Sequence, residues 1–482
     1  MSRQAIPAVA IRALVTGVAL LLAACAGPVA PGNIAPPVAV PAVWQQGTGG
    51  VPLDRDALSR WWTCFDDPVL TGLITGALGS SPDVRTALSR VAEYRARRNL
   101  ERAGLFPALN ASVAGGGTRT RDRATGLTVN SESFTASLDA SWQVDLFGTQ
   151  RLALDAASAD LAQMQENYRG AQVTLAAAVA TAYVGLRSAE AQLAVVQHSL
   201  GTREETVQLT QWREQAGTGS ALDTQQARTI LAQAQAAIPA LQLAIVQSRN
   251  QLALLCGRGP GALDDPLAAP RGVPAAPANL PAGLPAEILR QRPDVRAAER
   301  GLEAALARTS AARRQRLPAL TLTGSLGVEA PGLSRLSDPA TVVASLLGGL
   351  TAPIFDAGRI TQTIAIQGEL QQQALIAYEA TVLRALGEVE NALVAVRRDA
   401  ERQEILGRAT AAAGEAATLA GLQYQAGQVD LLVSLDAQRT LLDLQQQSVV
   451  STADRAGACI LLYQALGGGW PALLFPSPPV RP

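Results

Sequence analysis

Residues 134–146 read FTASLDASWQVDL and alternate strictly between apolar and polar side chains. A period of two is typical of a β-strand with one apolar face and one polar face. Three apolar residues at the same spacing begin a weaker partner strand upstream: Leu109, Ala111 and Val113. The polar stretch 118–133 between the two strands predicts an exposed hairpin loop.

This strand pair belongs to a sequence unit that occurs twice. Three pairs of segments show the duplication: SPDVR 81–85 with RPDVR 292–296, FPALN 106–110 with LPALT 317–321, and DLFG 145–148 with PIFD 353–356. Their offsets lie between 208 and 211 residues. Copy two also repeats the strand pattern, first at Leu320, Leu322, Leu326 and Val328, and again from Val342 through Leu346 and Leu350 to Ile354. We predict two copies, 61–257 and 284–470, joined by a Pro/Gly/Ala-rich linker at 258–283.

Between the strands the hydrophobic period lengthens to that of a coiled coil. From Leu161 to Leu200, apolar or small residues recur at steps of three and four, which predicts a helix with a packing seam. The helix, from about 151 to 215, would be roughly 98 Å long at 1.5 Å per residue. The seam continues in a return helix over 220–257, in which Pro239 predicts a kink.

The helix lengths suggest how the helices pack. The segments 83–104 and 220–257 together are about as long as the uninterrupted helix 151–215. We therefore hypothesise a helical cylinder in which two shorter helices run end to end beside one long helix.

The number of strands constrains the assembly. Four strands cannot close a barrel in lipid, because open edges leave backbone groups unpaired and single-chain barrels begin at about eight strands. The chain must therefore complete its sheet with copies of itself, giving eight strands from two copies or twelve from three. A soluble β-sandwich carrying helical hairpins is the alternative, although polar alternate faces suit water better than a second sheet.

The N-terminus indicates the compartment. An apolar stretch at 11–24 is short for a transmembrane helix and fits a signal peptide. It ends in LAAC at 22–25, which resembles a bacterial lipobox whose cysteine becomes the lipidated first residue. Ala26, rather than Asp, follows Cys25, as in lipoproteins sorted to the outer membrane. We predict a signal peptide at 1–24 and a lipidated tether at 25–60, with an ordinary signal peptide as the alternative.

Composition excludes several kinds of chemistry. All 40 basic residues are arginine, so the lysine of a phosphate-binding loop or a Schiff base is missing. His198 is the only histidine, which argues against His-rich metal sites and Ser-His-Asp triads; we expect it on the surface or in the seam. A net charge of +0 argues against nucleic-acid binding. We expect no catalytic site, no metal and no cofactor besides a covalent lipid on Cys25, and buried free thiols at Cys64, Cys256 and Cys459.

Several motifs then point to a known family. They are Trp61-Trp62 with Phe65, Asp67-Pro68 and Leu70, the two junction motifs DLFG and PIFD, Gly427 with LDAQR at 435–439, and YQALGGGW at 463–470. With them the chain resembles outer-membrane efflux factors of the TolC-like type, in the NodT-like lipoprotein branch that serves RND-type tripartite pumps.

The resemblance implies an α+β membrane protein and a homotrimer. Three chains would form a twelve-stranded β-barrel, four strands per chain, continued by a long α-helical coiled-coil tunnel across the periplasm. It also implies a lipid-anchored location in the outer membrane, with a periplasmic adaptor (membrane fusion) protein and an inner-membrane transporter of the RND type as partners. A Pro-rich tail at 471–482 would follow the second copy.

In this family the tips of the helical hairpins dock the adaptor and form the constriction. The docking residues would be the turn glycines Gly217, Gly219 and Gly427. Our gate candidates are Tyr424, Asp430 and Asp436 in copy two, with Asp223 and Arg213 in copy one. Ordinary helix caps and solvated tip charges are the alternative for each of them.

The sequence therefore favours a passive exit duct for drugs or other small molecules, because it has no energy-converting motif. A lipoprotein that forms no pore and acts as a structural or adaptor protein is the alternative function.

Overall fold

The described residues form two compact units. The computed structural model describes residues 38–45, 55–277, 285–332, 334 and 342–470. One unit, the strand unit, contains Arg90–Met164 and Ala297–Tyr378. The other, the hairpin unit, contains Val38–Ser89, Gln165–Arg296 and Glu379–Pro482. Each unit therefore draws corresponding segments from both copies of the repeat. The signal peptide, Cys25 and the tail 471–482 lie outside the described residues.

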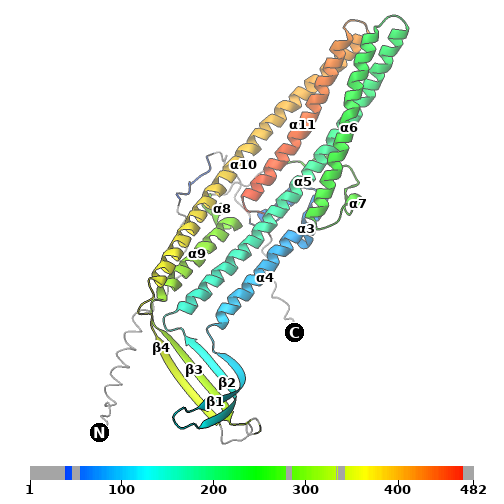
Figure 1. The fold of residues 1–482 in the computed structure, drawn as a ribbon. Helices are drawn as coiled ribbons and strands as arrows, with labels where there is room; N and C mark the ends of the chain where they lie inside the picture. Colours follow the sequence, from blue (N-terminus) through cyan, green and yellow to red (C-terminus); the bar gives the residue numbers. More distant parts are fainter. Residues whose placement is uncertain (1–37, 46–54, 278–284, 333, 335–341, 471–482) are drawn as a thin grey trace. The chain divides into compact units, whose positions relative to one another are not determined.

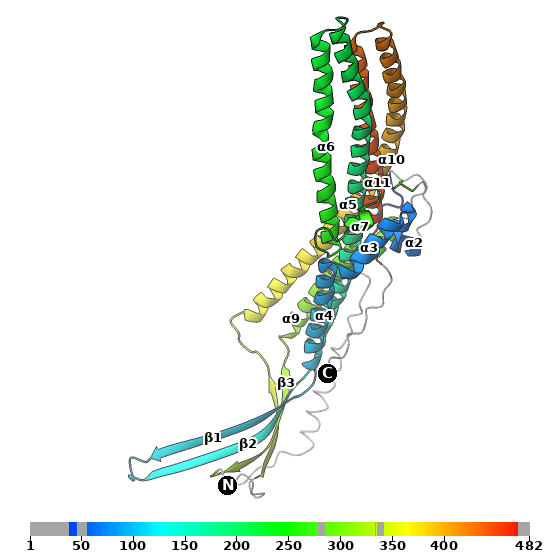
Figure 2. The same cartoon turned by 90° about the vertical axis from the view of Figure 1, so that its right-hand side faces the viewer.

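The duplication is confirmed in the lengths of the helices. The paired helices have 22, 67 and 35 residues: α4 (Pro82–Ala103) with α9 (Pro293–Arg314), α5 (Thr149–Gln215) with α10 (Arg359–Gln425), and α6 (Ala221–Leu255) with α11 (Leu431–Ala465). Figures 1 and 2 show α5 with α6 and α10 with α11 as two helical hairpins. Short helices complete the described chain: α2 (Arg55–Ser59), the 3₁₀ helix η1 (Trp61–Phe65), α3 (Pro68–Ser80), α7 (Asp264–Leu267) and α8 (Pro285–Gln291).

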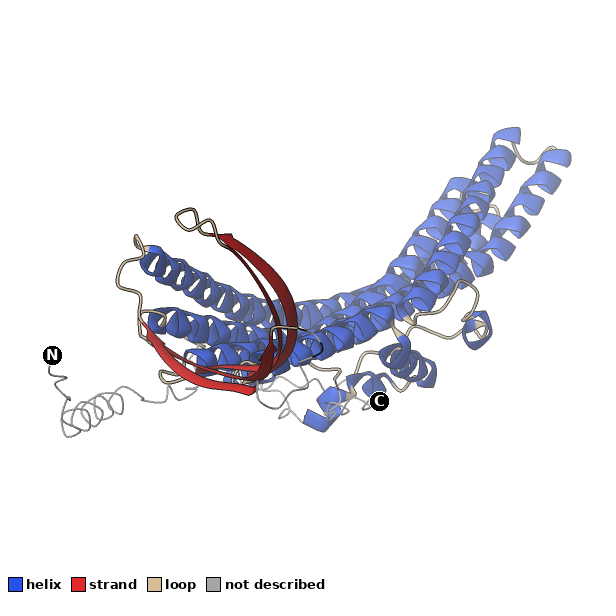
Figure 3. Ribbon diagram, turned by 60° about the horizontal axis from the view of Figure 1, so that its bottom comes forward, coloured by secondary structure: helices blue, strands red, loops and turns tan. Residues whose placement is uncertain are grey.

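The strand unit contains the four expected strands. They are β1 (Ala108–Arg121), β2 (Thr128–Val144), β3 (Ala319–Ala330) and β4 (Val342–Thr351). They pair antiparallel in the order β1-β2-β3-β4 (Figure 3). The outer edges of β1 and β4 therefore have no partner within the described chain.

The expected hairpin loop at 118–133 is wrong. β1 and β2 stay paired as far as Arg121 and Thr128, so the connection is only residues 122–127. Asp122 closes this turn, since its backbone N–H donates to the Leu127 carbonyl at 2.9 Å and its carboxylate accepts from the Ala124 N–H at 2.8 Å. The strand signal was missed because this part of the hairpin is polar on both faces. β4 is also shorter than expected and ends before Ile354.

The register gives the sheet one continuous apolar face. Side chains that share a face alternate along each strand and lie opposite one another across the ladder. One face consists of Leu109, Ala111, Val113 and Gly115 on β1, Phe134, Ala136, Leu138, Ala140, Trp142 and Val144 on β2, Leu320, Leu322, Gly324, Leu326, Val328 and Ala330 on β3, and Val342, Ala344, Leu346, Gly348 and Leu350 on β4. Most of its leucines are exposed, Leu346 at 86%, whereas Phe134 and Trp142 are half-buried.

The other face is mostly polar or small on β1 to β3, whereas β4 places Val343 and Leu347 on it. On β1 to β3 it carries Asn110, Ser112, Ala114, Gly116, Thr135, Ser137, Asp139, Ser141, Gln143, Thr321, Thr323, Ser325, Gly327 and Glu329. The Asp139 carboxylate accepts hydrogen bonds from the Ser112 and Ser137 hydroxyls at 2.9 and 2.8 Å. A face with hydrogen-bonded carboxylate and hydroxyl groups is suited to water.

Aspartates connect the strands to the long helices. Asp145 accepts from the backbone N–H groups of Gln150 and Arg151, at the start of α5. Asp356 accepts from the N–H groups of Gly358 and Ile360, at the start of α10. These N–H groups have no partner within the helix, so a carboxylate there is stabilising. The structure therefore pairs Asp145 with Asp356, whereas the sequence motifs had aligned Asp145 with Pro353.

The core of the hairpin unit forms around the aromatic residues of η1. The Trp61 ring stacks on Tyr463 of α11, with centroids 5.4 Å apart and an interplanar angle of 9°. The Tyr183 hydroxyl donates to the Asp67 carboxylate at 2.7 Å, and the same carboxylate caps α3. Cys256 and Cys459 are buried free thiols, as expected, whereas Cys64 is exposed.

A hydrogen bond links the end of each returning hairpin helix to the segment from which the shorter helix starts. Where α6 ends, the Ser80 hydroxyl between α3 and α4 donates to the Cys256 carbonyl at 2.7 Å. Where α11 ends, the Arg292 guanidinium donates to the Ala465 carbonyl at 2.8 Å. α6 itself continues as one helix through Pro239, which is exposed. In each copy, a side chain next to the start of the shorter helix therefore binds a carbonyl at the end of the hairpin helix.

Candidate functional site at the hairpin tips

The two hairpin turns have the same backbone. Gly217 and Gly427 take left-handed φ values of 73° and 71°. The next residue in each turn, Thr218 or Gln428, donates its N–H to a carbonyl five residues back at 2.8 or 2.9 Å. This Schellman arrangement satisfies the last carbonyls of a helix, and its left-handed position favours glycine. The turn glycines proposed as docking residues thus have a structural role in reversing the chain.

Gly219 has a tighter environment than its counterpart. A Cβ added there would lie 3.0 Å from Arg213 Cβ and 3.4 Å from the Arg213 carbonyl carbon. The equivalent residue of the second turn is Val429, which packs against the buried cluster of Tyr424, Leu431 and Leu435. In the first turn the backbone of Gly219 therefore packs closely against Arg213, whereas in the second turn Val429 packs against apolar side chains.

Asp223 belongs to a capping box at the start of α6. The Ser220 hydroxyl accepts from the Asp223 N–H at 3.2 Å, and the Asp223 carboxylate accepts from the Ser220 N–H at 3.2 Å. The two side chains satisfy each other's backbone donors. The helix-cap interpretation of Asp223 therefore has direct geometric support.

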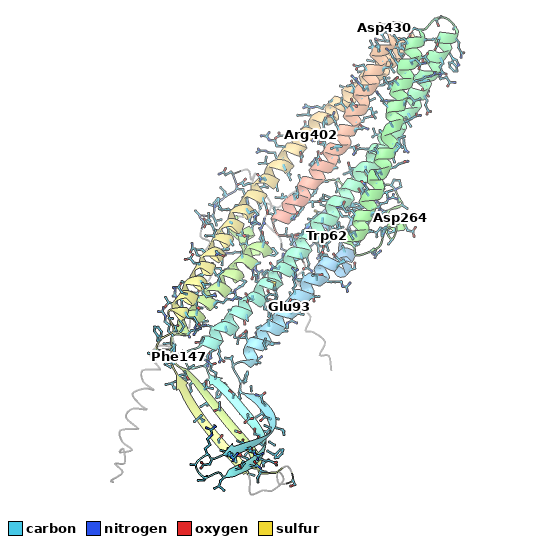
Figure 4. All side chains as sticks on the ribbon, viewed as in Figure 1. Trp62, Glu93, Phe147, Asp264, Arg402 and Asp430 are labelled. Carbon is cyan, nitrogen blue, oxygen red and sulfur yellow. The ribbon has the colours of Figure 1, made fainter. Side chains whose placement is uncertain are left out.

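Asp430 occupies the equivalent position at the start of α11 without that partnership. It is the N-cap residue and is exposed, but its carboxylate makes no capping hydrogen bond. Val433 stands where Asp223 completes the box in copy one. Figure 4 shows Asp430 at the turn end of its hairpin. Its charge is thus available to groups outside its own helix.

Arg213 joins the two hairpins. Its guanidinium donates to the carbonyls of Tyr424 and Gln425, both at 3.1 Å. It also lies over the Tyr424 ring, with Cζ 4.5 Å from the centroid. A cation at the last carbonyls of a helix is favoured by the helix dipole, and its position over a ring adds a cation–π interaction. The structure therefore brings together two gate candidates from different copies.

Asp436 is paired locally. Its carboxylate accepts from Arg439, one turn further along α11, at 2.7 Å, and both side chains are about two-thirds exposed, at 66% and 65%. An exposed pair of this kind contributes little stability. Among the described residues, Asp436 forms no hydrogen bond or ion pair with Arg213 or Tyr424.

A cavity of about 700 Å³ lies between the two hairpins below the tips. It is lined by α5, α10 and α11, and includes His198, Arg203 and Tyr424. Arg203 is only 5% exposed and donates to the Ile230 carbonyl at 3.1 Å. Burial lowers the pKa of Arg203, an effect that the Asp443 carboxylate partly opposes. The lone histidine is exposed and lines this cavity.

Two buried arginines were missed by the sequence interpretation. Arg203 continues the steps of three and four after Leu200, so a charged residue in the seam was the available signal. Arg187 is fully buried and donates to Glu190 at 2.6 Å and to the Ala269 carbonyl at 3.1 Å. Its partner carbonyl lies in the linker, so no local pattern predicts the contact.

A third arginine, Arg292, anchors the base of the second hairpin. It donates to the Glu388 and Asp294 carboxylates at 2.6 and 2.7 Å, besides the Ala465 carbonyl. Burial alone would raise the pKa of Asp294, but the hydrogen bond and charge of Arg292 outweigh it and lower that pKa. Among the described residues no group of three or more His, Cys, Asp or Glu could hold a metal ion.

Comparison with known proteins identifies the family. The family model for "Outer membrane efflux protein" matches residues 73–258 and 284–468. The chain is 33% identical to the toluene efflux pump outer membrane protein TtgF of Pseudomonas putida, over 90% of this chain and 92% of that protein. It is 33% identical to the pyoverdine export outer membrane protein OpmQ of P. putida, over 94% of this chain and 96% of that protein.

The solved structure of the outer-membrane channel OprN has the same fold. Its TM-score is 0.86 at 32% identity, covering 92% of this chain and 99% of that chain. The α+β fold expected from the sequence, with four strands and two long helical hairpins per chain, is thereby confirmed. The chain belongs to the family of outer membrane efflux proteins.

Proposed function

We propose that three copies of this outer-membrane efflux protein form the passive exit duct of a tripartite efflux system. The observation that carries the proposal is the sheet, which has one apolar face, one polar face and two unpaired edges. In lipid the edges must pair and the apolar face must turn outward. Copies of the chain that join β4 to β1 satisfy both requirements and enclose a water-filled lumen.

The stoichiometry follows from the width of the lumen. Eight strands enclose an interior that side chains largely fill, whereas larger barrels leave an aqueous channel. A duct for drug-sized molecules therefore needs the twelve strands of a trimer rather than the eight of a dimer.

Exposed apolar side chains on the helices support the same assembly. On α6, Leu243, Val246 and Leu254 are more than half exposed in one chain, at 58%, 53% and 71%. By length and composition this helix could even cross a membrane. We assign its exposed apolar face to contacts between subunits of the helical tunnel, because neighbouring helices would cover it there.

The hairpin tips are the proposed gate and docking surface. The Arg213–Tyr424 contact would hold the two hairpins of one subunit together, and three copies of Asp430 around the axis would repel one another and attract cations. Asp436 and Asp223 remain gate candidates with weaker support, because each already has a local partner. The tips carrying Gly217, Gly219 and Gly427 would meet the periplasmic adaptor protein, which connects to an inner-membrane transporter of the RND type.

A lipid on Cys25 is the proposed anchor. Intact-mass measurement of the protein from membranes should give the mass of a chain starting at Cys25 plus a diacylglyceryl and an acyl group. Cys25→Ser should lose that mass. An unmodified Cys25 would contradict the lipid anchor without affecting the channel proposal.

Trimer formation and conductance test the duct itself. We expect the full-length protein, purified in detergent, to migrate as a heat-modifiable trimer and to conduct ions in a planar bilayer. A variant with Pro in place of Leu346, in the edge strand β4, should lose both properties, because proline removes a backbone donor from a strand that must pair with a neighbour. Ala275→Pro, at an exposed position of the linker 258–283, provides a control outside both the sheet and the hairpin tips. A monomer that never conducts would instead support an adaptor-type lipoprotein without a pore.

A further inference from the structure

The β1–β2 hairpin extends beyond the rest of the sheet. β2 pairs with β3 only up to Phe134, opposite Ala330, whereas β1 and β2 remain paired for six more residues of β2, to Thr128. Figure 2 shows the projecting hairpin. These residues replace the loop that the sequence had suggested.

The apolar face ends where this extension begins. It spans ten residue steps along β2, from Val144 to Phe134, which is about 33 Å of strand and about 25 Å across a membrane at a tilt of about 40°. Aromatic residues lie at or near both limits, as in membrane barrels: Trp142 near one and Phe134 at the other. The Phe134 ring covers Gly115, where an added Cβ would lie 2.9 Å from Cε1.

Two arginines continue this face past its rim. Counting in twos along β1 from Gly115, the side chains on the lipid-facing side are those of Gly117, Arg119 and Arg121. Arg119 lies opposite Asn130 and Arg121 opposite Thr128. They stand four and six residue steps beyond Phe134, roughly 10 and 15 Å further from the apolar band at the same tilt. Both arginines are thus directed toward the headgroups around the barrel rather than into the lumen.

The charge of these arginines is not neutralised nearby. Both residues are exposed, and within the described chain neither makes an ion pair. Glu132, opposite Gly117, is the one carboxylate on their face of the extension. The other nearby carboxylate, Asp122, is held by the turn, where the Ala124 and Thr125 backbone N–H groups lower its pKa.

We propose that Arg119 and Arg121 bind the phosphate groups of the phosphorylated glycolipid in the outer leaflet of the outer membrane. This inference rests on the proposed function, which places the helices in the periplasm and therefore the β1–β2 turn at the cell exterior. Guanidinium groups suit phosphate because they donate parallel hydrogen bonds in a fixed fork. The aromatic rim marks the headgroup level, and the long side chains of Arg119 and Arg121 extend back toward it from their positions beyond the rim.

The test compares the full-length, detergent-purified protein with two variants. The first carries Arg119→Thr and Arg121→Thr. The second also carries Thr118→Arg and Thr120→Arg, which moves both arginines to the lumen side of the strand while keeping composition and net charge. Native mass spectrometry would measure binding of bisphosphorylated lipid A, of lipid A with both phosphates removed, and of inorganic phosphate.

We expect wild type to prefer bisphosphorylated lipid A and both variants to bind it roughly 30-fold more weakly, from the contribution of two basic residues at an anionic lipid surface. Equal binding by the second variant and wild type would overturn the proposal, since it would show that facing the lipid is irrelevant. Equal binding of the dephosphorylated lipid, or inorganic phosphate bound as tightly as the lipid, would also overturn it.

Conductance separates this inference from the function on which it rests. Both variants should still form conducting trimers, because the substituted residues lie outside the membrane band and the gate. The arginines on the lumen side of the second variant should lower its preference for cations. Conducting variants with unchanged lipid A affinity would overturn the lipid site alone. A wild-type protein that forms no conducting trimer would overturn the proposed duct.

Discussion

The turns of the two hairpins have the same backbone conformation, with Gly217 and Gly427 at left-handed φ values of 73° and 71°. Their side chains, however, form different interactions. In the first, Ser220 and Asp223 satisfy each other, and Arg213 reaches across to the other hairpin. The second receives that arginine and leaves the Asp430 carboxylate without a capping bond. Duplication thus preserved the chain reversal, while substitutions made one tip a donor and the other an acceptor.

The bases of the two hairpins differ in the same manner. Copy one closes the junction of α6 with a hydroxyl from Ser80, and copy two closes that of α11 with the guanidinium of Arg292. The arginine also binds two carboxylates, so copy two has an ionic network where copy one has a single neutral hydrogen bond. The difference between the two copies can be tested by substitutions at the bases of the hairpins and at their tips.

The largest effect is expected at Arg292. Arg292→Ala should lower the free energy of unfolding of the hairpin unit by about 2–3 kcal/mol, because it leaves a buried carbonyl and two carboxylates without their donor. Ser80→Ala, which removes the donor at the junction of copy one, should cost only about 1 kcal/mol. Chemical denaturation of the detergent-purified protein would measure both. Equal losses would contradict the claimed difference between the bases.

Arg213→Ala should have the next largest effect. The change removes two charge-assisted hydrogen bonds and a cation–π contact, together about 2 kcal/mol. We expect faster hydrogen exchange at the end of α10 and a higher single-channel conductance. Arg213→Lys keeps the positive charge but loses the two-pronged guanidinium donor. Its conductance should therefore lie between those of wild type and Arg213→Ala. Unchanged conductance in Arg213→Ala would show that the Arg213–Tyr424 contact is not part of the gate and only links the two hairpins.

The capping difference predicts a smaller, asymmetric effect. Ser220→Ala should destabilise α6 by about 1 kcal/mol. Asp430→Ala should cost α11 less than half of that, because no capping bond is lost. Introducing Ser at 430 together with Asp at 433, by Asp430→Ser and Val433→Asp, should build the missing box and stabilise the second tip by about 1 kcal/mol. Hydrogen exchange in the first turns of α6 and α11 would measure all three. Similar losses at Ser220 and Asp430 would contradict the asymmetry.

The network at the base of copy two also predicts an acid dependence. The pKa of Asp294 is lowered in the folded chain, so its contribution to stability is present above its unfolded pKa of about 4 and is lost as pH falls through the folded value. Asp294→Asn should therefore destabilise the protein at neutral pH but make little difference at lower pH. A gap between wild type and variant that stays constant from pH 7 to below 4 would rule out this linkage.

The periodic parts of the molecule could be predicted from sequence and the crossing contacts could not. Alternation at 134–146 and the seam of α5 identified strand and helix, because one face of each is apolar over many residues. The extension of β1 and β2 was missed, since its side chains are mostly polar on both faces. Arg187 and Arg203 bind carbonyls of Ala269 and Ile230, and such backbone partners leave no trace in residue type.

Contacts between distant segments cannot be predicted from sequence, so the role of the charged residues at the tips has to be measured. The Asp436 pair with Arg439 is about two-thirds exposed, so Asp436→Ala should change stability by less than about 0.5 kcal/mol. Its effect on conductance depends on whether its carboxylate, with that of Asp430, faces the axis of the trimer. If the two form the constriction, replacing both by Ala should raise the conductance of the closed channel and weaken its preference for cations. Asp454 lies further along α11 and pairs with Arg402 of α10. Asp454→Ala therefore serves as the control, because it removes a carboxylate from the same helix but away from the tip. A double variant with wild-type conductance and selectivity would show that these carboxylates only cap and solvate the tip, and the gate would then reduce to the Arg213–Tyr424 contact.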